Sequence, residues 1–137
     1  MRIVVDTNVI ISGFYSVQGH PAHIVDMIYR GEVELFYNNM IYDEYKDVLC
    51  RPKFGFKKEG IIAFLEAVTT VGTFINNSLD FAVPKKVCEK IPEQDIPFAQ
   101  VAYTAEAEYL ITGNTKHFPK KIGQTKVVSP KEFMDLV

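Results

Sequence analysis

Three acidic residues and one amide stand where a predicted strand has just ended or a predicted helix is starting. Asp6 follows three consecutive β-branched residues, and Asn114 follows a second apolar run of strand character. Glu44 and Asp95 lie near the starts of helical patterns. Oxygen ligands of this kind bind hard cations such as Mg²⁺ and Mn²⁺. Each position also has an ordinary structural explanation, which for Asp6 is an Asx-turn with the two residues that follow it.

Glu44 lies at the edge of the apolar side of a helix predicted over residues 40–50. A carboxylate there is partly desolvated, which is unfavourable unless it is paired, protonated or bound to a cation. The alternative is that Glu44 reaches out to water or to a lysine. At about 100° per residue, the core-facing side comprises Ile41, Tyr45, Val48 and Leu49, and the solvated side comprises Asp43, Lys46 and Asp47.

Asp95 has a similar ambiguity. It shares the inward side of a predicted helix with Phe98 and Ala102, which follow it at helical spacing. An Asp shortly before Pro97 is also an ordinary N-cap or first-turn acid. Glu93, at the same helix start, is expected to be solvated.

The histidines and cysteines show no spacing typical of a metal or redox site. His20, His23 and His117 are interpreted as incidental. Cys50 and Cys88 are far apart in the sequence. Free thiols, buried or half-buried in a protein of the reducing cytoplasm, are their simplest interpretation.

Short apolar strands alternate with helical patterns along the chain, which favours a three-layer α/β/α, Rossmann-like fold with a mostly parallel sheet. Residues 9–14 are expected to form a connecting segment. Residues 74–75 form either a strand or the end of a helix, with a turn at 76–78 and an extended segment at 79–83. We predict strands over 2–5, 33–37, 109–112 and 126–129, and helices over 20–30, 40–50, 58–71, about 92–107 and 130–136.

The bulk composition is that of an ordinary globular protein, with 47% hydrophobic and 23% charged residues. We expect a single domain over residues 1–137. No apolar run approaches the roughly 20 residues of a membrane span, and the N-terminus lacks a signal-peptide pattern. A cytoplasmic protein with no membrane partner is expected.

In a doubly wound sheet, the carboxyl ends of the strands and the helix starts that follow them meet in one crevice. Asp6, Glu44 and Asp95 would repel one another there, and at least one pKa would rise unless a cation compensates. Mg²⁺ or Mn²⁺ would suit these ligands and could activate water for attack on a phosphodiester.

Two other enzyme or signalling classes that place an Asp after the first strand fit less well. Phosphatases of the haloacid dehalogenase type need a second acid two residues after the first, where this chain has Asn8. Response-regulator receivers need an acidic pair near the end of the first strand, and residues 2–6 show no such pair.

The chain resembles PIN-domain ribonucleases, and among them the VapC-like toxin components of prokaryotic toxin–antitoxin pairs. This resemblance implies a Mg²⁺- or Mn²⁺-dependent endoribonuclease that is inhibited by a cognate antitoxin and, as in many members, forms a homodimer. The matching pieces, over about residues 1–119, are Asp6-Thr7-Asn8-Val9, Glu44, Asp95 with Phe98 and Ala102, and Tyr109-Leu110-Ile111-Thr112-Gly113-Asn114.

Carried over by position, the resemblance makes Asp6 and Asp95 the principal metal ligands. Glu44 completes the acidic cluster, directly or through water. Asn114 stands where many family members have a fourth Asp. It can offer a carbonyl oxygen but supplies no charge and cannot act as a base, so a second ion is disfavoured. The alternative function is a catalytically weak or inactive PIN-like module that binds metal, RNA or a protein partner without cleavage.

Other polar groups would support this site. Thr7, Asn8 and Thr112 are expected to hydrogen-bond the carboxylates or a phosphate. Lysine runs are usually solvated surface, but those that flank Asp95 and Asn114 could line a phosphate-binding rim. We predict that one of them lines the RNA path, even though the net charge is −2. The basic clusters are Arg51, Lys53, Lys57 and Lys58; Lys85, Lys86 and Lys90; and Lys116, Lys120 and Lys121.

Overall fold

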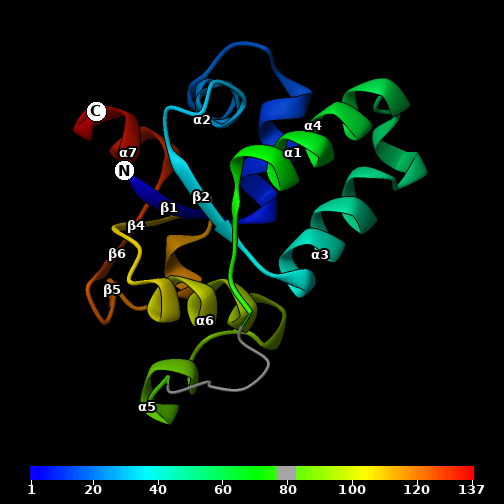
Figure 1. Cartoon of the computed structure of the whole chain (residues 1–137). Coiled ribbons are helices and arrows are strands. Elements are labelled where there is room, and N and C mark those ends of the chain that lie inside the picture. The colour runs from blue at the N-terminus through cyan, green and yellow to red at the C-terminus, as the bar shows by residue number, and fades with distance from the viewer. Residues whose placement is uncertain (77–82) are drawn as a thin grey trace.

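The computed structural model describes residues 1–76 and 83–137. Within them the chain forms a six-stranded sheet in the order β3-β2-β1-β4-β6-β5 (Figure 1). Neighbouring strands are parallel, except for the antiparallel pair β5 and β6. The strands are β1 (Arg2–Val5), β2 (Glu34–Tyr37), β3 (Thr73–Phe74), β4 (Tyr109–Ile111), β5 (Lys121–Ile122) and β6 (Thr125–Val128).

Helices cover both faces of this sheet. The helix α2 packs against α1, α4 and α7 on one face, and α6 packs against β1, β2 and β4 on the other (Figure 1). This arrangement confirms the predicted three-layer α/β fold with a mostly parallel sheet. The helices are α1 (Thr7–Tyr15), α2 (His20–Tyr29), α3 (Asn39–Leu49), α4 (Lys58–Val71), α5 (Lys85–Cys88), α6 (Ile96–Ala105) and α7 (Pro130–Leu136), with 3₁₀ turns η1 (Pro52–Phe54), η2 (Glu93–Asp95) and η3 (Thr115–His117).

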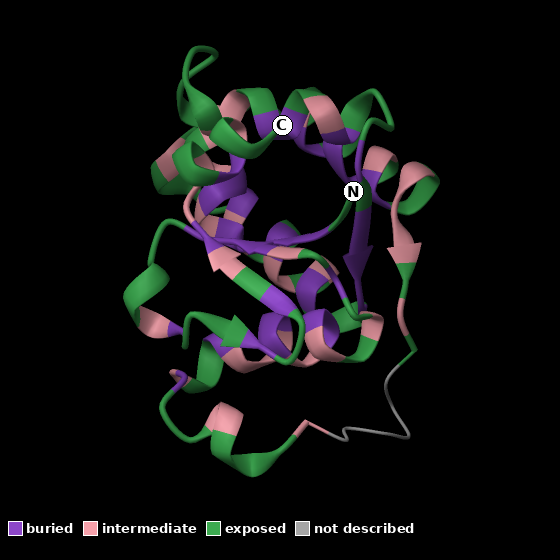
Figure 2. Ribbon diagram, turned by 90° about the vertical axis from the view of Figure 1, so that its left-hand side faces the viewer, coloured by how far each residue is buried: buried purple, intermediate pink, exposed green. Residues whose placement is uncertain are grey.

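The central strand β1 is apolar on both sides because it lies between the two helical layers. Ile3, Val4 and Val5 are each 0% exposed, as expected for a strand covered on both faces. Figure 2 shows the buried residues concentrated in the central strands and on the sheet-facing sides of the helices, whereas the edge strand β3 is only partly buried. The sheet therefore holds the end of β1, and Asp6 with it, in a rigid position.

The prediction of a connecting segment over residues 9–14 is wrong, because these residues belong to α1. Ser12 and Gly13 resemble loop residues in the sequence, but Gly13 serves helix packing. A Cβ at Gly13 would lie 2.7 Å from Val25 Cγ2 and 3.0 Å from the Pro21 carbonyl oxygen. The glycine therefore allows α1 and α2 to approach closely.

The remaining predicted elements are confirmed with small shifts at their ends. Thr73–Phe74 forms a strand, whereas the predicted turn at 76–78 and extended segment at 79–83 fall mostly outside the described residues. The sequence did not predict α5 or β5, each too short to show a period. Both cysteines are free, as predicted, but Cys50 is exposed because it follows the last turn of α3.

Among the helices of residues 1–76 and 83–137, none combines the length and apolarity that crossing a membrane requires.

Candidate active site

The candidate site lies where the strand order of the sheet reverses. From β1 the chain moves outward through β2 and β3, and then returns to pair β4 with the other side of β1. Val5 lies opposite Ile111 in this pair, and the Asp6 N–H donates to the Ile111 carbonyl oxygen at 2.9 Å. Asp6 and Thr112 therefore leave neighbouring strands at the same edge, which is where open α/β sheets bind ligands.

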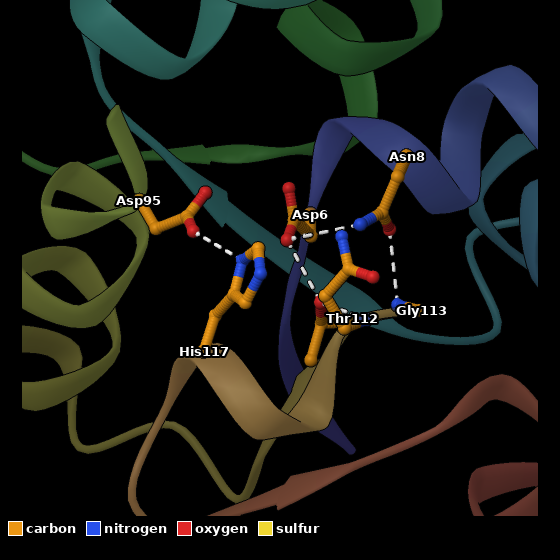
Figure 3. A network of polar contacts seen from close by, with 7 residues as sticks. Asp6, Asn8, Asp95, Thr112, Gly113 and His117 are labelled. Atoms are coloured by element: carbon orange, nitrogen blue, oxygen red, sulfur yellow. Dashed lines mark hydrogen bonds and ion pairs between the residues drawn. The ribbon is translucent and has the colours of Figure 1, made fainter. Parts of the chain in front are cut away.

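The Asp6 carboxylate is 5% exposed and is held by two side chains from this edge. Its Oδ2 accepts hydrogen bonds from Thr112 Oγ1 at 2.8 Å and from Asn8 Nδ2 at 3.4 Å (Figure 3). Asp6 occupies the N-cap position of α1, but within the described residues its side chain makes no capping hydrogen bond. A helix cap therefore does not explain this buried acid.

Glu44 reaches the same edge from α3. Asn38 caps this helix by accepting the Ile41 N–H at 2.9 Å. The fully buried Tyr45 donates its hydroxyl to the Val5 carbonyl, which fixes α3 against the end of β1. Glu44 is half-buried, and its Oε2 accepts the hydroxyl of Thr7.

The solvated side of α3 is also as predicted: Asp43, Lys46 and Asp47 are all exposed.

Asp95 comes from the opposite helical layer, at the start of α6, and is 8% exposed. It makes no side-chain cap bond to α6 within the described chain. Instead its Oδ2 lies 3.0 Å from Nδ1 of His117, in η3 after β4 (Figure 3). The interpretation of His117 as incidental is therefore wrong. Its position shortly after the end of β4 was the available signal, because this loop returns to the same edge. Glu93 is exposed, as expected.

The three carboxylates influence one another electrostatically. Burial raises the pKa of Asp6 to about 6, against the hydrogen bond from Thr112, and the charges of Asp95 and Glu44 add to the rise. Burial also raises the pKa of Glu44, against the hydrogen bond from Thr7, and Asp95 adds to the rise. Among the described residues, none of these acids forms an ion pair with a lysine or arginine. The charge of Arg51 lowers the pKa of Glu44 only in part, so the cluster carries negative charge with no lysine or arginine paired to it among these residues.

Asn114 occupies a different part of this edge. It is exposed, and its backbone N–H donates to Thr112 Oγ1 at 3.0 Å. Asn8 Oδ1 accepts the N–H of Gly113 at 3.0 Å, so the loop after β4 is attached to the start of α1. Together with Asn8 and Ser12, Asn114 lines a pocket of about 240 Å³. No hydrogen bond in the described part of the chain joins its side chain to the three acids.

The acids fit a hard cation that is held by few protein ligands. No three His, Cys, Asp or Glu residues of 1–76 and 83–137 are grouped closely enough to hold one ion between them. Mg²⁺ usually keeps several waters and binds one or two carboxylates together with substrate phosphates. Asp6 and Asp95, which point toward one another across the site (Figure 3), suit that pattern better than a closed protein cage.

Comparison with known proteins decides the family. The model of the PIN domain family matches residues 2–116. The chain belongs to the PIN domain family. PIN domains are generally nucleases. An uncharacterized protein of Methanocaldococcus jannaschii is 29% identical over 147 residues, spanning 98% of this chain and 90% of the relative.

A solved structure has the same PIN fold. It is the crystal structure of VapBC2 from Rickettsia felis bound to a DNA fragment from their promoter. The match has a TM-score of 0.65 at 17% identity and covers 94% of this chain and 98% of the solved chain. At this identity the likeness concerns the fold.

Proposed function

We propose that this PIN-domain protein is a Mg²⁺- or Mn²⁺-dependent endoribonuclease and the toxin of a toxin–antitoxin pair. The observation that carries the proposal is the convergence of Asp6, Glu44 and Asp95, from three distant parts of the chain, on the switch point of the sheet. Two of these acids are at most 8% exposed. Burial of several acids that are not paired with a lysine or arginine is unfavourable and is expected where a cation is to be bound.

Asp6 and Asp95 would hold the ion, and Glu44 would act on it through water, because no three acids of the described residues are close enough to bind one ion directly. Once bound, a divalent cation of this kind neutralises phosphate charge and lowers the pKa of bound water. The residues of the chain orient the ligands. Thr112 and Asn8 fix the Asp6 carboxylate by hydrogen bonds.

The remaining two acids have their own supports. Thr7 holds Glu44, and His117 holds one oxygen of Asp95. Supports of this kind keep ligands in the geometry that the ion requires. Asn114 would lie at the rim of the site as a neutral residue, where its side-chain carbonyl oxygen would contact water or phosphate.

The proposed partners are RNA as substrate and a cognate antitoxin, for a cytoplasmic protein that forms a homodimer. The shared fold with the VapBC2 structure, which is bound to a DNA fragment from their promoter, supports an antitoxin partner.

A second candidate function is a PIN module that binds metal, RNA or protein without cleaving. The observation that favours it is Asn114, a neutral, exposed residue whose backbone N–H donates to Thr112 and not to one of the acids. The two candidates differ in turnover and share the ion site.

Incubation of the purified protein with assorted RNAs, in Mn²⁺, Mg²⁺ or EDTA, tests the proposal. Asp6→Asn is the site variant. Asp43→Asn, an exposed acid beside Glu44 on the same helix, is the matched control. We expect cleavage in metal by the wild type and the control only. Equal cleavage by Asp6→Asn would indicate a contaminant, and metal binding without cleavage would favour the binding module.

A further inference from the structure

Two lysine clusters that are distant in the sequence line one groove beside the candidate site. Lys86 and Lys90, in and just after α5, form one side, and Lys116 and Lys121, in η3 and β5, form the other. This groove has a volume of about 370 Å³ and is also lined by His117. It therefore begins at the residue that holds Asp95.

A second groove continues the first. It has a volume of about 630 Å³, shares Lys116 and Lys121 with the first groove, and adds Lys120 and Lys126. Glu132 also lines it, but its carboxylate accepts the backbone N–H of Ser129 at 2.9 Å. We call the two together the lysine groove, defined by Lys86, Lys90, Lys116, Lys120, Lys121 and Lys126.

We propose that the lysine groove binds the phosphate backbone of single-stranded RNA next to the bond that is cut, an inference that rests on the proposed function. The charges are available for this role. All six lysines are exposed, and none forms an ion pair within residues 1–76 and 83–137. In a protein of net charge −2, such a local concentration of positive charge attracts polyanions.

The recessed acids favour a single strand over a duplex. Asp6 and Asp95 are 5% and 8% exposed, so a phosphate must enter a recess to reach them. A single strand can bend its backbone into the recess, whereas a duplex holds its phosphates on a rigid outer surface. Phe118 in the groove is 7% exposed and offers little surface for base stacking. Binding is therefore dominated by phosphate charge and depends strongly on salt.

The salt dependence gives the expected size of the effect. Each phosphate neutralised on a single strand contributes about −0.7 to the slope of log K against log salt. Removing Lys86 and Lys90 should make this slope shallower by about 1.4. Over a fourfold rise in salt, the wild-type affinity should then fall about sevenfold more than that of the variant.

Fluorescence anisotropy with a labelled single-stranded RNA in EDTA, where binding is separated from cleavage, tests the proposal. K86A/K90A and K116A/K121A should each lose about 1.4 from the slope. The control K57A/K58A removes an exposed lysine pair at the start of α4 and should keep the wild-type slope. Duplex RNA of the same sequence should bind more weakly.

Three results would contradict the proposal that the groove binds RNA: an unchanged slope in both groove variants, an equal loss of slope in K57A/K58A, or tighter binding of the duplex. The absence of RNA binding by the wild type would also contradict it and would point to an acidic protein partner. Cleavage of RNA by the wild type in Mn²⁺ is measured separately. Cleavage with an unchanged slope would contradict RNA binding by the groove but not the proposed nuclease function. The expected slopes without cleavage would support RNA binding by the groove and contradict the proposed nuclease function.

Discussion

Replacing the buried Asp6 with its neutral isostere should stabilise the protein, and more so at neutral pH than in mild acid. The pKa of Asp6 is about 6 in the folded protein, against 3.8 for an ordinary Asp side chain. Between these values the folded state keeps a proton that the unfolded state has lost. The free energy of unfolding therefore falls as pH rises through this window. Asp6→Asn removes this effect.

The magnitude follows from the two pKa values. Ionised Asp6 destabilises the wild type by about 1.6 kcal/mol at about pH 5 and by about 3 kcal/mol at about pH 7.5. The stability advantage of Asp6→Asn should thus grow by about 1.4 kcal/mol between these conditions. Any change in the hydrogen bonds from Thr112 and Asn8 contributes at both pH values and largely cancels in this difference.

Urea unfolding followed by circular dichroism, in EDTA at both pH values, measures the two free energies. Asp43→Asn, in an exposed position, should show no such growth. A gap between Asp6→Asn and wild type that is equal at both pH values would refute the reasoning. It would mean that Asp6 ionises in the folded protein as freely as in water.

Three further predictions concern a support of the site and the packing of the helices around it. His117→Ala should weaken Mn²⁺ binding by about tenfold, measured by calorimetric titration. His117→Asn keeps a hydrogen-bond donor for Asp95 and should recover part of the lost affinity. Equal Mn²⁺ affinities in the wild type and both variants would show that His117 does not support the site. Tyr45→Phe leaves the Val5 carbonyl without its partner and should cost about 1–3 kcal/mol in urea unfolding; wild-type stability would show that water replaces the hydroxyl. Gly13→Val should cost about 1–3 kcal/mol because a Cβ there meets α2 at 2.7 Å, whereas an unchanged melting temperature would mean that the helices separate without cost.

The sequence predicted the sheet and most helices because their apolar patterns are periodic. The same periodicity placed Glu44 at the border of α3, where it lies half-buried. It failed for α1, because Gly13 is needed for contact with α2, a partner that no local pattern reveals. The apolar periodicity did not predict β5 because a strand of two residues is too short to show a repeating pattern.

The sequence predicted the three acids of the candidate site but did not predict His117, which contacts Asp95. Asp6 and Asp95 could be proposed because they follow a strand and precede a helix that topology brings together. His117 could not, because its contact with Asp95 depends on how the loop after β4 turns back through η3. The convergence of the lysines from α5 and β5 on one groove likewise depends on the path of the chain in space.

The most direct test of the central claim, that these acids hold a cation for water to attack RNA, is cleavage in H₂¹⁸O with mass spectrometry of the products. We predict a linear phosphate that carries one oxygen from solvent, formed only with Mg²⁺ or Mn²⁺ and absent with Asp6→Asn. Attack by water does not use the ribose 2′-hydroxyl. A 2′,3′-cyclic phosphate, or cleavage that persists in EDTA, would contradict the claim.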